Sequence, residues 1–212
     1  GFLFSMMLTP IYTHFAYKYH FWKKQKKKTV DGKDLPIMTK LHAHKFKHDF
    51  PTMAGLIGVV TVTIVTWVFN LDRGQTWLPL VGFLGGSFVG VIDDAINIFG
   101  NGRGAAGLRG PVKFLLITIV GVALGWFFAV KLGWTAIWIP FLGDINVGIV
   151  GMIAIFAFAV VATSNAVNIT DGLDGLSGGL AIMAYCAYGV IALFQGNILL
   201  FGFCMTVAGW LL

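Results

Sequence analysis

The chain has 212 residues, of which 57% are hydrophobic and only 11% are charged, and its mean hydropathy is +0.82. Soluble globular domains do not reach this composition, so the main solvent of the chain must be lipid. The two cysteines, Cys186 and Cys204, lie in apolar sequence without a CxxC spacing, which gives no support to a disulfide framework or a zinc site.

Uncharged apolar stretches follow one another along the chain. A helix that crosses a bilayer needs roughly 17–25 mainly apolar residues, and such stretches cover residues 1–17, 52–69, 74–92, 114–130 and 145–170. Residues 175–212 also carry no charge, and the turn signal at residues 195–197 divides them into two spans. The sequence therefore predicts an all-α integral membrane protein with about seven transmembrane helices in one domain, residues 1–212. Both ends lie in apolar sequence without a basic leader, so we expect this domain to be part of a larger bundle.

Lysine and arginine are distributed unevenly between alternate loops. Thirteen of the fifteen lie on one side, in residues 18–51 and 103–113, whereas only Arg73 and Lys131 lie on the other. Because positively charged loops stay in the cytoplasm, residues 18–51 and 93–112 are predicted to be cytoplasmic loops, basic and glycine-rich respectively, and residues 165–176 a cytoplasmic active-site segment. This topology also explains the net charge of +6 without any binding of nucleic acid.

Residues 132–147 lie on the opposite side, between two predicted helices. Their composition predicts a short external β-hairpin with Gly143 and Asp144 at its turn. Trp134 and Trp138 flank it, and aromatic residues of this kind favour the membrane interface. No chemistry is assigned to this segment.

Asp93 and Asp94 end a long apolar stretch, where a carboxylate at bilayer depth costs about 3 kcal/mol. This cost indicates a functional role, although two solvated charges that stop a helix at the interface are a simpler alternative. Successive helical residues project about 100° apart, so the two carboxylates do not face one ligand together. We therefore expect different roles for them.

Asn165, Asn168, Asp171 and Asp174 recur at every third residue. Over a helix such positions form a slowly drifting stripe, and their oxygen atoms suit magnesium or ribose hydroxyls. Gly172 lies within this run and opens the backbone to the close approach of a ligand. A polar cap between two spans is the alternative interpretation.

A third group of polar side chains precedes the span that begins near residue 52. Its cations make it a ready anion site, and its histidines lack the cysteine or carboxylate partners typical of zinc, apart from Asp49. The members are Lys40, His42, His44, Lys45, Lys47 and His48.

Two glycine patterns have structural interpretations. Residues 102–107 fit the pattern G-x-G-x-x-G, but they lie between membrane helices rather than in a βαβ unit, so we interpret them as a glycine-rich loop. Gly82, Gly86 and Gly90, at a spacing of four, are predicted to form a helix-packing face.

Carboxylates, amides, lysines and histidines thus gather at one surface of the membrane. Phosphoryl transfer needs this combination, because phosphates require cationic groups and a metal held by oxygens, while a carboxylate positions or deprotonates the attacking oxygen. A lipid phosphate as acceptor explains why the site lies at the bilayer surface. A transporter or non-catalytic membrane scaffold is a remote alternative, since its polar groups should extend through the midplane to both sides.

Four segments resemble the polyprenyl-phosphate N-acetylhexosamine-1-phosphate transferases of glycosyltransferase family 4, and among them most closely the phospho-MurNAc-pentapeptide transferases. They are His44-x-x-Lys47 leading into residues 51–55, residues 90–94 with Asp93 and Asp94, residues 107–113 with Lys113, and residues 165–176 with the run NAVNITDGLDGL. Order, spacing and sidedness agree over nearly the whole chain, and the last segment is the most specific.

The resemblance implies that undecaprenyl phosphate attacks the sugar-linked phosphate of UDP-MurNAc-pentapeptide, giving lipid I and UMP with Mg²⁺ as the cofactor. It implies a multi-pass protein of the bacterial inner membrane whose partners are these two substrates and membrane lipid, without nucleic acid, and it allows a homodimer. By the same resemblance, Asp93 is the candidate base, and Asp94 and Lys113 position phosphates.

The other candidate residues also come from the resemblance. Asn168 is a candidate metal ligand, with the main ligand expected further downstream, while Lys47, Asp171 and Asp174 line the nucleotide pocket. The catalytic set comprises Asp93, Asp94, Lys113 and Asp171, and the substrate-binding set comprises His44, Lys47, Asn165, Asn168, Asp171, Gly172 and Asp174.

The chain departs from the family pattern at two places. Asp49 and Phe50 stand where the family has Gly-Thr, and Pro111 stands where it has Arg, so we expect altered loop geometry there. The family's later magnesium-binding Asp and histidine-rich loop are absent from the 212 residues, so the isolated chain is expected to be inactive. The runner-up function is that of a sister enzyme, which transfers GlcNAc-1-phosphate from UDP-GlcNAc to the same lipid.

Overall fold

The computed structural model describes residues 1–21, 53–72, 74–99, 107–172 and 175–212. In this part of the chain there are seven α-helices and one β-hairpin. The helices are α1 (Phe2–Lys18), α3 (Gly55–Phe69), α4 (Trp77–Phe99), α5 (Gly110–Trp126), α6 (Gly148–Thr170), α7 (Leu176–Phe194) and α8 (Ile198–Leu211). A π-helical turn, η1 (Phe127–Lys131), continues α5, and the hairpin consists of β1 (Ala136–Ile139) and β2 (Gly143–Asn146).

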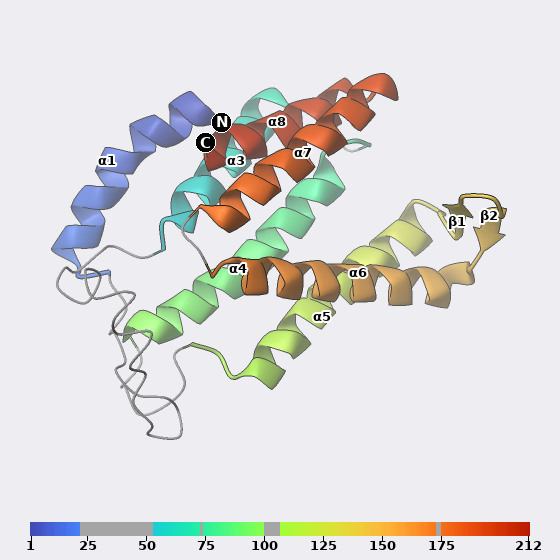
Figure 1. Ribbon diagram of the computed structural model, residues 1–212, viewed down its shortest axis with the longest axis horizontal. Helices are drawn as coiled ribbons and strands as arrows, with labels where there is room; N and C mark the ends of the chain where they lie inside the picture. The colour runs from blue at the N-terminus through green and yellow to red at the C-terminus, as the bar shows by residue number, and fades with distance from the viewer. Residues whose placement is uncertain (22–52, 73, 100–106, 173–174) are drawn as a thin grey trace.

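Four of these helices are long and apolar enough to cross a membrane: α4, α5 with η1, α6 and α7. The apolar helices α3 and α8 are shorter. This mostly helical chain with one small hairpin confirms the predicted all-α membrane fold. The two chain ends lie side by side, and α1, α3, α7 and α8 gather around them, whereas α5 and α6 form a second group with the hairpin at its far end (Figure 1).

The helix α4 continues beyond the point where the sequence analysis ended it. The predicted loop at residues 93–112 is wrong at both borders, because α4 extends to Phe99 and α5 already begins at Gly110. The two aspartates do not end the helix, since residues 95–99 contain no proline or glycine and Ile98 is buried. Pro111 lies in the first turn of α5, where its missing N–H is not needed, so this departure from the family pattern suits the helix start.

The hairpin forms as predicted, but its turn lies elsewhere. Gly143 is already the first residue of β2 and pairs with Ile139, and Asp144 pairs with Trp138. The turn is made by residues 140–142, closed by a hydrogen bond of 3.1 Å from the Leu142 N–H to the Ile139 carbonyl. Proline at its second position favours such a turn, which is why the chain reverses before the Gly-Asp pair.

Close packing between α5 and α6 depends on two glycines that the sequence analysis did not single out. A Cβ at Gly121 would lie 2.8 Å from the Ala157 Cα, and one at Gly125 would lie 2.9 Å from the Ile153 Cα. Small residues at a spacing of four allow two helix backbones to approach in this way. Close approach increases van der Waals contact, which matters because the hydrophobic effect does not drive helices together in lipid.

The predicted packing face of α4 is only partly realised. A Cβ at Gly82 would lie 3.3 Å from a Leu124 methyl, in contact with α5, but one at Gly86 or Gly90 would have no atom within 4 Å. These two glycines instead line a cavity. Glycine spacing identifies a surface without side chains, and the neighbouring helix decides whether that surface is filled.

The helices α3, α4 and α8 pack around a small core. Val62 of α3, Leu80 of α4 and Phe203 of α8 are buried together there with Cys204 and Val207. Cys204 is a free cysteine that contributes to the packing of this core. At the start of α8, the Gln75 Oε1 accepts hydrogen bonds from the N–H groups of Leu199 (3.0 Å) and Leu200 (3.4 Å), which satisfies donors that a helix start leaves unpaired.

The α5–α6 contact can be tested with Gly121→Ala. We expect this variant to be less stable than Gly179→Ala by about 1–3 kcal/mol, because only the first forces a methyl group against a backbone, whereas a Cβ at Gly179 meets nothing within 4 Å. Both changes add the same helix propensity, so the difference isolates the steric effect. The measurement is unfolding in mixed detergent micelles, and equal stabilities would contradict the close packing.

Candidate functional site

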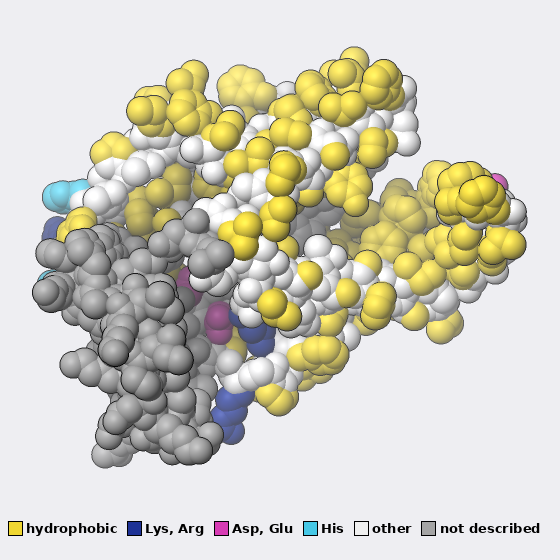
Figure 2. Space-filling model, viewed as in Figure 1, with side chains coloured by type: hydrophobic (Ala, Val, Ile, Leu, Met, Phe, Trp, Pro, Cys, Tyr) yellow, Lys and Arg dark blue, Asp and Glu magenta, His cyan; other side chains and the backbone are white. Residues whose placement is uncertain are grey.

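A cavity of about 1040 Å³ is lined by residues of α4, α5, α6, α7 and α8. Much of its wall is apolar and includes Phe83, Val120, Phe156 and Phe203. Polar side chains meet at the end where α5 starts, α6 finishes and α7 starts: Lys113, Asn168, Asp171 and Ser177. On the face drawn in Figure 2, most of the visible Lys, Arg, Asp and Glu side chains also lie toward this end. The cavity therefore has a polar mouth and an apolar interior.

Asp93 connects α4 to the segment before α5 and to the first turn of α5. Its Oδ1 accepts a hydrogen bond of 2.7 Å from the Leu108 N–H, and its Oδ2 lies 3.3 Å from the Lys113 Nζ. The side chains of Asp93 and Lys113 are only 20% and 30% exposed, so solvent screens this ion pair less than a pair at the surface. The carboxylate thereby holds both the start of α5 and the ammonium group that lines the cavity.

Gly107 makes this arrangement sterically feasible. Its φ is +95°, in the left-handed region, and a Cβ there would lie 2.4 Å from the Asp93 Oδ1 and 2.9 Å from the Asn97 amide nitrogen. Only glycine adopts this φ and leaves the carboxylate free to approach the backbone. The requirement explains a glycine in the segment that precedes Lys113.

Asp94 belongs to a different environment. It interacts electrostatically with the phenol of Tyr12 on α1, and it is not among the residues that line the cavity. The two neighbouring carboxylates thus point to different elements, as the 100° rotation per helical residue requires.

The cavity-facing side of α6 follows the helical period rather than a period of three. Its lining residues are Phe156, Ala159, Val160, Thr163, Ser164, Val167 and Asn168, followed by Asp171 at the C-cap. Asn165, at three residues before Asn168, has rotated away, and its Nδ2 donates to the Val161 carbonyl at 3.0 Å. A pattern search at 3.6 residues per turn would have identified Ser164, which the sequence analysis missed.

Asp171 occupies the C-cap of α6, beside the start of α7. Its Oδ1 accepts a hydrogen bond of 2.8 Å from the Ser177 hydroxyl. Gly172 follows directly, and Gly175, with a φ of +81°, reverses the chain into α7. Ser177 was missed because its role depends on this reversal, which no local sequence signal reveals.

Three candidate residues, His44, Lys47 and Asp174, lie outside the described residues. Of the others, Lys113, Asn168 and Asp171 line one cavity and Asp93 contacts it through Lys113, whereas Asp94 and Asn165 do not. Within the described ranges, no three His, Cys, Asp or Glu side chains form a group that could hold a metal. Asn168, Asp171 and Ser177 supply oxygen donors of the kind that Mg²⁺ prefers, together with water and substrate phosphate.

The profile of Glycosyl transferase family 4 matches residues 76–212. Among similar proteins are three named phospho-N-acetylmuramoyl-pentapeptide-transferase. That of Lactobacillus acidophilus is 35% identical and aligns over 80% of this chain and 53% of its own length. The proteins of Chloroflexus aggregans and Clostridium beijerinckii are 33% and 31% identical, with 99% and 100% of this chain and 56% and 62% of their own lengths covered.

The chain therefore spans between 53% and 62% of the length of these curated relatives. The profile match begins just before α4 and includes every helix that lines the cavity. On this match, the chain belongs to glycosyl transferase family 4.

Proposed function

We propose that the full-length protein transfers phospho-MurNAc-pentapeptide from UDP-MurNAc-pentapeptide to undecaprenyl phosphate. In this reaction an oxygen of the lipid phosphate bonds to the sugar-linked phosphorus, and the bond from that phosphorus to the UMP oxygen breaks. The products are lipid I and UMP. Three relatives that carry the name of this transferase support the assignment.

The observation that carries the proposal is the cavity with an ammonium group at its mouth and an apolar interior. The acceptor has the same division, with a phosphate at one end and a long hydrocarbon chain behind it. Lys113 supplies a positive charge for the phosphate, and side chains such as Val120 and Phe203 supply the apolar wall. The apolar wall stabilises the bound hydrocarbon chain of the acceptor. The Lys113 ammonium group stabilises its phosphate.

For Asp93 the geometry favours a role through Lys113. One of its oxygens accepts a hydrogen bond from the Leu108 N–H and the other pairs with the Lys113 ammonium group, so both are already engaged by groups of the protein. We propose that Asp93 orients the ammonium group at the cavity mouth, in place of the base role that the resemblance implies. Asp94 stays a candidate for phosphate positioning.

We propose Mg²⁺ as the cofactor, with Asn168 and Asp171 among the groups that hold it and Ser177 orienting the Asp171 carboxylate. When bound, the ion would neutralise charge on the diphosphate of the donor. Asn165, Gly172, His44, Lys47 and Asp174 keep the nucleotide-side role implied by the resemblance. A homodimer and an inner-membrane location with the site facing the cytoplasm belong to the same proposal.

The choice of donor is tested by UMP release from the purified full-length protein with undecaprenyl phosphate and Mg²⁺. We expect release with UDP-MurNAc-pentapeptide and none with UDP-GlcNAc, and no release from the 212 residues alone or after chelation of the metal. Release with UDP-GlcNAc only would replace this proposal by the sister activity. Release with neither donor would contradict transferase activity altogether.

The role of Asp93 is tested with Asp93→Asn, Lys113→Ala and the double variant. If Asp93 acts through Lys113, each single change lowers turnover by about 10²-fold, the usual effect of losing one charged transition-state contact, and the double variant is no slower than Lys113→Ala. Asp144→Asn on the distant hairpin is the matched control. A double variant far slower than either single one would restore the base role.

The close approach at Gly107 gives a separate prediction. Gly107→Ala should lower turnover at least tenfold, because a methyl group displaces the Asp93 carboxylate from the Leu108 N–H and from Lys113. Gly110→Ala is the control, since a Cβ there meets nothing within 4 Å and its φ is ordinary. Turnover and amount of inserted protein are measured for both. Full activity of Gly107→Ala would show that the contact is dispensable.

A further inference from the structure

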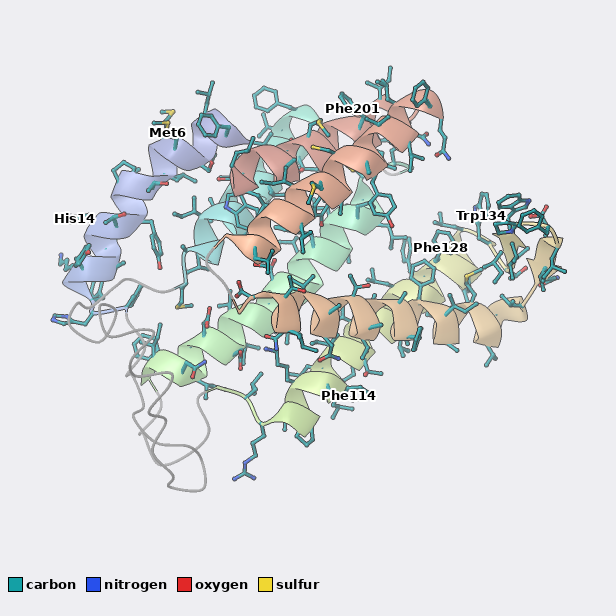
Figure 3. The ribbon with its side chains drawn as sticks, viewed as in Figure 1. Met6, His14, Phe114, Phe128, Trp134 and Phe201 are labelled. Carbon is teal, nitrogen blue, oxygen red and sulfur yellow. The ribbon has the colours of Figure 1, made fainter. Side chains whose placement is uncertain are left out.

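Two contacts lie at the base of the hairpin, one to the end of the α5 span and one that closes the hairpin itself. The Trp134 ring contacts the Phe128 ring at a centroid distance of 6.2 Å, and the Val147 N–H donates to the Thr135 carbonyl at 2.9 Å. Figure 3 shows Trp134 beyond Phe128, where the chain leaves η1. The turn at residues 140–142 extends past these contacts.

The turn is apolar and has no cover in the described structure. Phe141 is fully exposed and Leu142 is 72% exposed. Asp144 is the only charged residue in residues 132–147, and the register pairs it with Trp138. Ile137 pairs with Ile145 on the opposite face, so the hairpin has one apolar face and one mixed face.

The backbone keeps Phe141 at a conformation that its side chain disfavours. Its φ is +72°, at the position of a type II turn where glycine is normal. Backbone strain of this kind is concentrated at positions where the side chain has a functional or binding role. Here the conformation directs a phenyl ring away from the protein, so that role must come from contact with something outside the described chain.

The apolar turn is continuous with the lipid-facing surface of the spanning helices. Val130 and Leu132 at the end of the α5 span and Val150 at the start of α6 are exposed, and the exposed Trp134 connects them to the hairpin. A strand of four residues reaches roughly 13 Å, and the headgroup layer on each side of the hydrocarbon is about 5–8 Å thick. The strands bend away from the axis of α6 (Figure 1), which keeps the turn near that layer.

We propose that the hairpin lies on the membrane surface at the end of the bundle opposite the cavity mouth, with Phe141 and Leu142 inserted at the boundary between headgroups and acyl chains. Aromatic residues favour this depth. The mixed face with Asp144 is then turned to water. Insertion of the turn anchors the outer ends of α5 and α6. This inference does not rest on the proposed transferase activity.

The proposal is tested by nitroxide labelling of Leu142→Cys and, as the matched control, Asp144→Cys. Both are made in the full-length protein in liposomes, with Cys186, Cys204 and any other cysteine replaced by alanine. Collision rates with oxygen, which concentrates in lipid, and with a water-soluble nickel complex are measured by power saturation. We expect the ratio of oxygen to nickel collisions to be several-fold higher at position 142 than at position 144.

Two results overturn the proposal. Equal nickel access at both positions places the turn in water. Shielding of position 142 from both reagents, in liposomes and in detergent, means that a second copy or another part of the protein covers it.

A second measurement applies if the cysteine-free protein does not fold. Leu142→Cys and Asp144→Cys are then made with the other cysteines kept, and their rates of reaction with a membrane-impermeant maleimide are compared. We expect position 142 to react slowly in liposomes and fast in detergent. Fast reaction at 142 in both, or slow reaction in both, overturns it.

Discussion

Lipid requires each spanning segment to satisfy its own backbone hydrogen bonds, and the rest of this structure follows from that constraint. Helices meet the requirement, so the chain is a set of apolar helices in which charged side chains are confined to helix ends and loops. Lys113, Asn168, Asp171 and Ser177 all lie within about one turn of a helix end. Three helix ends that meet at one side of the bundle, the start of α5, the end of α6 and the start of α7, then suffice to bring these four polar side chains together.

The Asp93–Lys113 ion pair shows how such a site is held together. Asp93 lies inside α4, roughly one and a half turns before its end, so a rigid helix presents its carboxylate. Lys113 lies in the first turn of α5, and the Leu108 N–H comes from the chain between them. A single carboxylate therefore fixes the separation of two helices and the position of a cation at the cavity mouth. A side chain that does not itself line the cavity thus positions one that does.

Small residues perform two opposite tasks in the bundle. Gly121 and Gly125 bring α5 against α6, whereas Gly86 and Gly90 leave space that the cavity occupies. The difference does not lie in the glycines or in their spacing, which is four in both cases. It lies in the partner surface, because α6 presents backbone to α5 while α4 faces the space in front of α7.

The sequence by itself determined the solvent, the helical class of the fold and the presence of the hairpin, because apolar runs and turn residues are local signals. It also determined that Asp93 and Asp94 diverge, since that follows from helix geometry alone. Tertiary structure decided which polar residues meet. Asn168 and Asp171 share the cavity with Lys113 and Ser177. Asn165 turns away, because each step of three residues drifts by about 60° around the helix and two steps separate it from Asp171. Tertiary structure also decided that α4 passes through its carboxylate pair and continues to Phe99. The positions of neighbouring helices are not local properties, and only the folded chain specifies them.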